Sequence, residues 1–171
     1  MRSKVYVAES RIHGQGVFAA ITLKPGEPVL ILDDSREVTP DNPLRTDEGE
    51  HPRFCDFLDN DRVVLMQPPE RYINHSCSPN VFVKTFGGVR YVLALKMIYA
   101  TEELAFDYCI NSRGNTIWLC NCGSPRCRHT IHSDFFQLPF QLQLEYLPLL
   151  DAWFVQENRE QIDALLRKAL R

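Results

Sequence analysis

The sequence has no hydrophobic stretch that approaches the roughly 20 residues needed to span a membrane. Its first ten residues, MRSKVYVAES, lack the apolar segment of a signal peptide. Positive charge is not in excess either, because 19 Lys and Arg residues stand against 22 Asp and Glu residues, for a net charge of -3. These absences argue against a membrane protein, a secreted protein and a general nucleic-acid binder. They favour an intracellular protein that acts on a basic partner.

Helical periodicity is also missing before about residue 138, so the body of the chain is predicted to be β-rich. Its 171 residues suit one domain with a small appendage. Strands are expected at residues 4–10, 16–21, 27–34, 62–67, 80–86, 89–95 and 103–110. Gly87-Gly88 suits a two-residue hairpin turn between two of them. Residues 39–61 read as a loop-rich insert, and six acidic residues lie between positions 47 and 61.

The last third of the chain changes to helical spacing. Asn158 and Gln161 have the spacing of a capping box, which predicts that a helix begins there. Pro148 separates this helix from an earlier short one. The apolar residues that repeat at helical intervals are Leu150, Trp153, Phe154, Ile162, Leu165, Leu166 and Leu170.

Three of the six cysteines lie in CNCGSPRC, residues 120–127, with the spacing Cys-x-Cys-x4-Cys. A disulfide within Cys-x-Cys is strained, whereas thiolates at this spacing suit a tetrahedral zinc ion. A structural site needs a fourth ligand, for which Cys77 is a candidate and His129 and His132 are rivals. The alternative is a loop of free thiols. Cys55 and Cys109 are interpreted as small apolar core residues.

Two further motifs carry polar or aromatic groups at unusual places. SRIHGQGVF contains Gly14-x-Gly16 after a strand but lacks the third glycine and the helix of a dinucleotide site. It is either a turn between strands or a backbone segment that approaches a ligand closely. ELAFDY, residues 103–108, places Phe106 and Tyr108 on one face of a strand and Asp107 on the other, facing a hydrogen-bond donor.

In chain order, GQG, RYINHSCSPN, ELAFDY and CNC-x4-C resemble the SET-domain protein-lysine methyltransferases with a post-SET zinc segment. The resemblance covers about residues 4–132. It implies a mostly β, α+β protein with a SET fold of small curved sheets around a knot-like crossing, followed by C-terminal helices. The implied divisions are a SET domain at 1–115 with an insert at about 39–61, a post-SET zinc segment at 116–133 and a C-terminal helical extension at 134–171.

The resemblance also implies roles for single residues. Tyr108 corresponds to the catalytic tyrosine, and Phe106 lines an aromatic channel for the substrate lysine. Phenylalanine rather than tyrosine at position 106 predicts a capacity for di- or trimethylation. The implied contacts to the methyl donor, S-adenosylmethionine, come from Gly14, Gln15, Gly16, Arg71, Tyr72, Asn74, His75 and Ile131. One structural zinc ion would be held by Cys77, Cys120, Cys122 and Cys127.

The implied function is methyl transfer to a lysine of a protein or peptide, with histone tails as candidate substrates. One alternative is a catalytically silent, zinc-stapled binding module that recruits partners through its C-terminal helices, and another is a methyltransferase for a non-histone protein. The location is then nuclear in a eukaryote and cytoplasmic in a bacterium. The acidic insert is either a solvated loop or a wall of the peptide groove. The C-terminal helices either cover the donor site, dimerise or pack on the body, and the oligomeric state stays open.

Overall fold

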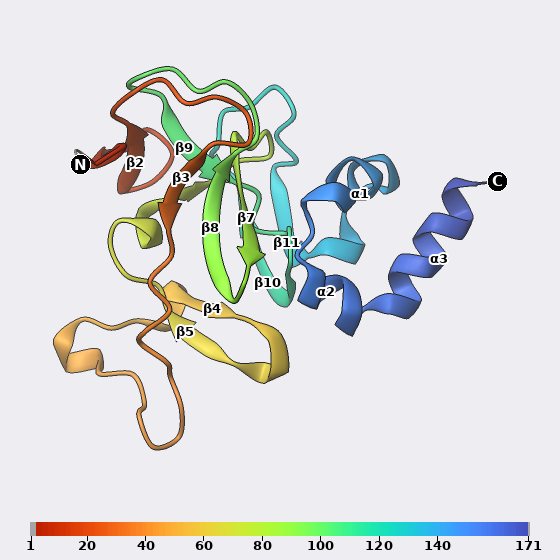
Figure 1. Cartoon of the computed structure of the whole chain (residues 1–171), viewed down its shortest axis with the longest axis horizontal. Coiled ribbons are helices and arrows are strands. Elements are labelled where there is room, and N and C mark those ends of the chain that lie inside the picture. Colours follow the sequence, from red (N-terminus) through yellow and green to blue (C-terminus); the bar gives the residue numbers. More distant parts are fainter. Residues whose placement is uncertain (1–2, 171) are drawn as a thin grey trace.

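Short strands arranged in small sheets form the body of the molecule (Figure 1). The computed structural model describes residues 3–170. The largest of its sheets has the strand order β1-β2-β9-β6, formed by β1 (Val5–Glu9), β2 (Gln15–Ala19), β9 (Glu103–Phe106) and β6 (Asn74–His75). β6 runs parallel to β9, whereas the other pairings in this sheet are antiparallel. The pairing of β6 with β9 thus joins two segments that lie about 30 residues apart in the chain.

A second sheet has the order β3-β8-β7 and contains the predicted hairpin. Its strands are β3 (Pro28–Ile31), β7 (Val81–Phe86) and β8 (Val89–Ala94). Gly87 and Gly88 connect β7 to β8 with φ angles of +58° and +79°, which confirms the predicted turn. The insert holds β4 (Cys55–Phe57) among single turns of 3-10 helix at Thr46–Glu48, Pro52–Phe54 and Asp59–Asp61, and β4 pairs antiparallel with β5 (Val63–Leu65), which lies directly after the insert. Strand β4 was not predicted, because Cys55-Asp56-Phe57 stands in a stretch rich in acidic residues that was interpreted as a loop, without the run of β-branched residues that marks β5.

A further hairpin, β10 (Arg113–Leu119) with β11 (Thr130–Asp134), was also not predicted from the sequence. Strand β10 begins with Arg-Gly-Asn-Thr, of which glycine and asparagine are depleted in strands, and its register with β11 shifts between Arg113 and Ile117. Most of its side chains are exposed, so no buried face marks it in the sequence.

The chain ends in helices, as predicted: α1 (Phe140–Tyr146), α2 (Ala152–Glu157) and α3 (Arg159–Ala169). Helix α3 begins directly after Asn158, but the predicted capping box is wrong. The side chain of Asn158 instead donates to the carbonyl of Phe154 at 2.8 Å and accepts from Arg113 of β10 at 2.6 Å. A tertiary contact has therefore replaced the local cap. Figure 1 shows these helices to one side of the sheets, on the side of β10 and β11.

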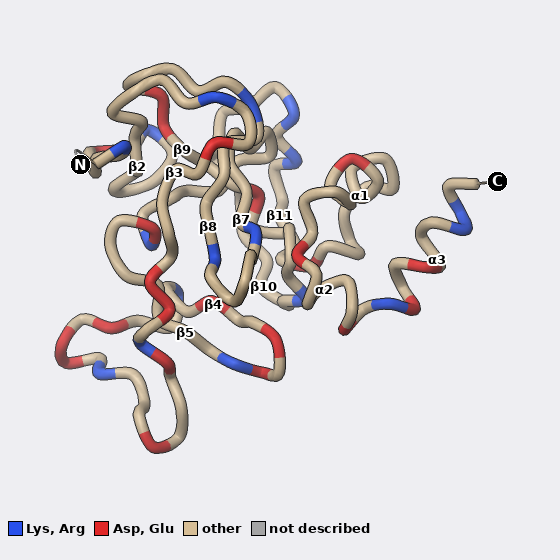
Figure 2. Tube along the Cα trace, in the orientation of Figure 1, with Lys and Arg blue, Asp and Glu red and all other residues tan. Residues whose placement is uncertain are grey.

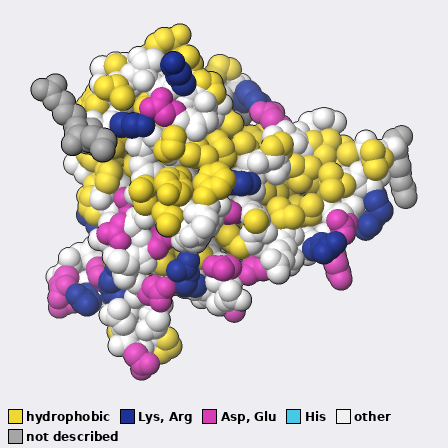
Figure 3. All heavy atoms as spheres, viewed as in Figure 1, with side chains coloured by type: hydrophobic (Ala, Val, Ile, Leu, Met, Phe, Trp, Pro, Cys, Tyr) yellow, Lys and Arg dark blue, Asp and Glu magenta, His cyan; other side chains and the backbone are white. Residues whose placement is uncertain are grey.

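Two hydrophobic cores lie beneath these elements. The first joins the two larger sheets and includes Val17, Leu23, Ile73, Val81, Val92, Ile98 and Leu104. The second joins the β10–β11 hairpin to the C-terminal helices and includes Cys77, Cys109, Ile131, Phe135, Leu142, Tyr146 and Phe154. The helices therefore pack on the body through a shared core, which was one of the three roles considered for them. Apolar side chains also cover part of the surface over the sheets and helices (Figure 3). Among residues 3–170 no helix is both long and apolar enough to cross a membrane.

Acidic residues are spread along the insert (Figure 2), and two of them bind arginines that lie outside it. Glu50 accepts two hydrogen bonds from Arg36, at 2.9 and 2.7 Å, and one from the backbone N–H of Arg45 at 2.8 Å. The bond from Arg36, followed by that from Arg45, lowers the pKa of Glu50 to about 2. Asp56 accepts a hydrogen bond from Arg90 at 2.5 Å. At least two of the insert's acids therefore have a structural role.

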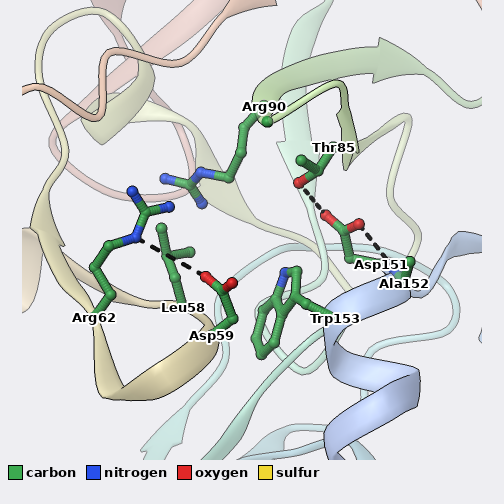
Figure 4. A pocket seen from close by; sticks show the side chains of 9 residues that line it. Leu58, Asp59, Arg62, Thr85, Arg90, Asp151, Ala152 and Trp153 are labelled. Carbon is green, nitrogen blue, oxygen red and sulfur yellow. Dashed lines mark hydrogen bonds and ion pairs between the residues drawn. The ribbon is translucent and has the colours of Figure 1, made fainter.

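The insert also meets helix α2 around a cavity of about 190 Å³ (Figure 4). Asn60 of the insert donates its backbone N–H to Glu157 at 3.1 Å, and Thr85 of β7 donates to Asp151 at 2.6 Å. Arg62 and Trp153 face this cavity from opposite sides. None of the site residues predicted from the sequence lines it.

Arg90 is a buried charge that holds the insert to the sheet β3-β8-β7 through Asp56. It is 5% exposed and also donates to both oxygens of Asp34, at 2.8 and 2.6 Å. Burial disfavours its charge, but the two aspartates outweigh that effect and raise the pKa of Arg90 above its usual value. Arg90→Leu should lower the free energy of unfolding by about 2–3 kcal/mol, because two carboxylates lose their partner and regain only part of their hydration.

The measurement is the urea midpoint at pH 7, beside Arg62→Leu as a control. Arg62 makes only exposed ion pairs, with Glu37 at 3.3 Å and Asp59 at 3.9 Å, so its loss should cost no more than about 1 kcal/mol. Equal midpoints for the two variants would contradict the structural role of Arg90.

Candidate functional site

The parallel pair formed by β6 and β9 places the RYINHSCSPN segment beside the ELAFDY segment. Asn74 is paired with Ala105, and His75 with Phe106. Asn80 extends this contact, since its side chain accepts from the N–H of Ala105 at 2.9 Å and donates to the carbonyl of Glu103 at 2.8 Å. The polar residues of the segment therefore satisfy backbone groups of the buried contact between β6 and β9, which is called the crossing below. An unpaired backbone group there would be costly.

Asn74 connects this crossing to the glycine turn between β1 and β2. Its side-chain nitrogen lies within hydrogen-bond distance of the carbonyl of Gln15 at 2.9 Å and that of His13 at 3.2 Å. The same nitrogen is 2.9 Å from a carboxylate oxygen of Glu103 and 3.1 Å from the hydroxyl of Ser10. One buried amide thus orients the backbone of residues 13–15. This segment overlaps the glycine turn, where contact with the methyl donor was predicted.

The two glycines of this turn are there for different reasons. Gly14 has a φ of +51°, which is the left-handed region that favours glycine. Gly16 has ordinary backbone angles, but a Cβ atom added there would collide with the carboxylate of Glu103. The segment is therefore a turn between two strands, which was the first of the two sequence interpretations. Its close approach to a ligand stays a prediction.

Arg71 and Tyr72 lie just before β6, on a single turn of 3-10 helix (Glu70–Tyr72). The guanidinium of Arg71 donates to the hydroxyl of Tyr72 at 2.8 Å and lies over the rings of Tyr72 and Phe54, at 4.9 and 5.1 Å from their centroids. Its Nε atom is buried and has no hydrogen-bond partner among residues 3–170. A buried, unpaired cationic donor of this kind fits an anionic group of a ligand.

Four aromatic rings gather next to the crossing. Tyr108 lies 5.0 Å from Phe106, 5.3 Å from His75 and 6.0 Å from Trp118, measured between ring centroids. Phe106 and Tyr108 were predicted on one face of a strand; their rings do lie side by side, but β9 ends at Phe106 and Tyr108 follows it. Trp118 comes from β10 and also lies 5.6 Å from His75, edge to face. These rings make an apolar surface at the end of β9.

Tyr108 keeps a neutral hydroxyl in this setting. Burial, with a smaller contribution from the charge of Glu103, raises the pKa of Tyr108 to about 12. Its hydroxyl donates to the carbonyl of Ile73 at 2.8 Å, so the lone pairs of its oxygen are available to accept a further hydrogen bond. The residue as a whole is 37% exposed, so an incoming group can reach its ring.

His75 is buried beside Tyr108 and accepts the backbone N–H of that tyrosine at 3.1 Å through Nδ1. Burial lowers the pKa of His75 to about 4, while the nearby charge of Asp107 opposes the shift and is outweighed. The ring is therefore neutral near pH 7 and serves as a hydrogen-bond acceptor for the backbone that carries Tyr108.

The four predicted cysteine ligands lie together. The sulfur atoms of Cys77, Cys120, Cys122 and Cys127 are all within 4.8 Å of one another. Cys77 and Cys120 are 3.8 Å apart, which matches the roughly 3.8 Å edge of a tetrahedron with zinc–sulfur bonds of about 2.3 Å. The donor set and its spacing fit one zinc ion.

The two rival ligands lie elsewhere. His129 has a φ of +62° and enters the local structure through its carbonyl, which accepts from the N–H of Cys120 at 2.7 Å. His132 is exposed, and its carbonyl accepts from the thiol of Cys109 at 3.1 Å. Ile131 lies between them in sequence and is 1% exposed within the second core. Its predicted contact with the adenine of the methyl donor stays a prediction, and it is as deeply buried as Cys77, which is also 1% exposed.

Sequence reasoning assigned no role to three residues of this region. Trp118 lies on a strand that was not predicted, and Asn80 was noted only as the last residue of the RYINHSCSPN motif. Arg128, directly after a cysteine, forms an ion pair with the fully buried Asp107. The prediction that Asp107 faces a donor is thereby confirmed, but a single arginine in a loop carries no signal of which carboxylate it will meet.

A model of the SET domain matches residues 14–109, which is over half of the chain. The Drosophila melanogaster protein named histone-lysine N-methyltransferase trr is 35% identical over 140 residues, covering 74% of this chain and 6% of the fly protein. Human histone-lysine N-methyltransferase 2B is 32% identical over 146 residues, covering 77% of this chain and 5% of the human protein. The chain thus spans only a small fraction of the length of these relatives.

A crystal structure of a Plasmodium falciparum protein assigned as a histone methyltransferase also resembles this chain. It aligns with a TM-score of 0.50 at 22% identity and covers 63% of this chain and 95% of that one. The likeness, together with the small sheets and few helices, confirms the predicted mostly β fold.

Proposed function

Because the chain belongs to the SET-domain family, we propose that it is a protein-lysine N-methyltransferase, with S-adenosylmethionine as the methyl donor. The observation that carries this proposal is that Asn74 and the β6–β9 pair bring the glycine turn and the hydroxyl of Tyr108 into one region. The 3-10 turn that carries Arg71 contacts β2, which begins in the glycine turn. Names of relatives alone would leave open whether this chain still has the groups that the chemistry needs.

The residues present fit the donor. The unpaired Nε of Arg71 would receive an anionic group, such as the carboxylate of the donor's amino-acid end. The turn at Gly14, Gln15 and Gly16 offers backbone without side chains at two of three positions. Tyr72, Asn74, His75 and Ile131 complete the proposed donor set. When bound, the donor supplies an electrophilic methyl group on a sulfonium.

The chain's own task is to deliver a neutral lysine amine. Free lysine has a pKa near 10.4, so loss of its proton near pH 7 costs roughly 4.6 kcal/mol. Phe106, Trp118 and the ring of Tyr108 would favour the neutral amine by excluding water from it. The oxygen of Tyr108, whose own proton is held by the carbonyl of Ile73, would accept an N–H of the amine and orient its lone pair.

The substrate is proposed to be a lysine in a basic protein segment, with histone tails first among the candidates because the relatives carry histone-lysine in their names. A histone substrate would place the protein in the nucleus of a eukaryotic host, and another target would leave the cytoplasm open. The bonds of Glu50 and Asp56 favour a structural role for part of the acidic insert. Asp59 and Asp61, at its 3-10 turn, are the better candidates for contact with a basic peptide.

Tyr108→Phe tests the proposed reaction. It should reduce methyl transfer to histone octamers or cell lysate by roughly 100-fold, because the amine loses the acceptor that orients it. Transfer is followed with a donor labelled at its methyl group, beside Tyr99→Phe, an exposed tyrosine whose loss should leave transfer unchanged. If the wild type binds the donor in calorimetry yet labels no protein, the silent binding module is the better explanation.

Phe106→Tyr tests the predicted product. The wild type should form di- or trimethyl-lysine, and the variant should stop at monomethyl-lysine, because the added hydroxyl occupies room needed by a methylated amine. Mass spectrometry of a modified peptide counts the methyl groups. Phe86→Tyr, on an exposed ring, serves as the matched control. A wild type that stops at one methyl group, as the variant does, would contradict the assignment.

The cysteine cluster is proposed to hold one structural zinc ion. Elemental analysis should find about one zinc per chain, and Cys120→Ser should lose most of it. Chelation of the wild type should lower Tm by about 10 °C or more, because metal binding contributes folding free energy. Cys55→Ser, outside the cluster, should keep its zinc. A Cys120→Ser protein with full zinc content would refute this assignment.

A further inference from the structure

A fully buried carboxylate lies between the two aromatic residues of the proposed channel. Asp107 is 0% exposed and directly precedes Tyr108 in the chain. Its Oδ1 accepts from Arg128 at 2.9 Å and from the N–H of Cys109 at 3.1 Å. Its Oδ2 lies 2.8 Å from Arg128 and accepts the hydroxyl of Tyr146 at 3.3 Å. A buried charge is tolerated only when each of its oxygens is held in this way.

The partners of Asp107 lead to the other parts of the site. Arg128 directly follows Cys127, and its backbone N–H donates to the sulfur of Cys77 at 3.4 Å. Asp107 is also 3.7 Å from the ring nitrogen of His75 that accepts the N–H of Tyr108. The carboxylate is therefore the point at which the cysteine cluster, the crossing and the segment 106–108 meet.

Tyr146 is the residue of the C-terminal helices that binds Asp107. It ends helix α1 and is 1% exposed in the second core, beside Phe135 and Leu142. Burial, followed by the charge of Asp107, raises the pKa of Tyr146 above its usual value, so its hydroxyl is a permanent donor. Its ring already fills the core as phenylalanine would, and the hydroxyl has Asp107 as its partner.

We propose that Tyr146 is a positioning residue for Tyr108, and that the C-terminal helices thereby complete the methyl-transfer site. This inference rests on the proposed function. Without the hydroxyl of Tyr146, the Oδ2 edge of Asp107 is held by Arg128 alone. The carboxylate can then tilt, and the backbone on both sides of it carries Phe106 and Tyr108. Small displacements of an orienting group cost rate rather than substrate binding.

The test is Tyr146→Phe in the full-length, zinc-loaded protein, assayed well below its Tm. We expect kcat to fall about tenfold, while KM for the peptide, the donor Kd from calorimetry and the zinc content stay within about twofold of the wild type. Tyr91→Phe, on strand β8, is the matched control and should change none of these. A purely structural hydroxyl would lower Tm and leave kcat intact, and that result would overturn the proposal, as would a rise in KM with kcat unchanged.

A second measurement separates this proposal from the proposed function. Trp118 and Trp153 are the two tryptophans of the chain, so Trp153→Phe leaves Trp118 as a single fluorophore 6.0 Å from the ring of Tyr108. In that background, Tyr146→Phe should about double the quenching of Trp118 by acrylamide, whether or not any substrate is methylated. Unchanged quenching would overturn the positioning role, whereas changed quenching in a protein that transfers no methyl group would overturn only the proposed reaction.

Discussion

The parallel contact between β6 and β9 is the constraint on which the rest of the structure depends. It is only two residue pairs long, so its own backbone bonds contribute little. Asn74 and Asn80 extend it with side-chain bonds to the glycine turn and to β9, and His75 adds an acceptor for the N–H of Tyr108. A crossing of buried backbone in the middle of a small protein leaves donors and acceptors that no regular sheet can satisfy. Amide and imidazole side chains satisfy them, which is why such a polar segment lies where a core would be expected.

A consequence is that stability and the site use the same groups. The glycine turn is oriented by an amide that also belongs to the crossing, and the ring of Tyr108 rests on a histidine whose Nε2 lies 3.4 Å from the sulfur of Cys77. Substitutions in this region would alter folding and ligand contact together. In the proposed reaction the arrangement would also supply preorganisation. The hydroxyl of Tyr108 is already held by the carbonyl of Ile73, so its oxygen would not need to be oriented by the substrate.

The parts of the site that could be predicted from the sequence are those encoded by short spacings. Cys-x-Cys-x4-Cys, the Asn74-His75 pair and the Phe106-x-Tyr108 pair each leave a local pattern. The structure brings the four cysteines together and places the rings of Phe106 and Tyr108 side by side, whereas the roles of Asn74 and His75 toward the methyl donor stay predictions. The β10–β11 hairpin left none, because an exposed, bulged strand has no buried face to repeat. The cap at Asn158 failed for a related reason, since Arg113, 45 residues away, offered its side chain a better partner than the local backbone did.

Tyr146 illustrates the remaining limit. Helical spacing in the C-terminal region predicts that an apolar face is buried, but it does not identify the surface that covers it. In the structure that surface contains Cys109 and Ile131, so the second core runs without interruption from the cysteine cluster into the helices. A boundary drawn in the sequence near residue 134 therefore cuts through one packed unit. Because a packed core is rigid, a hydroxyl at the end of α1 can fix a carboxylate next to Tyr108 as firmly as a residue within the strand could. On this view the helices are part of the catalytic unit and not an appendage to it.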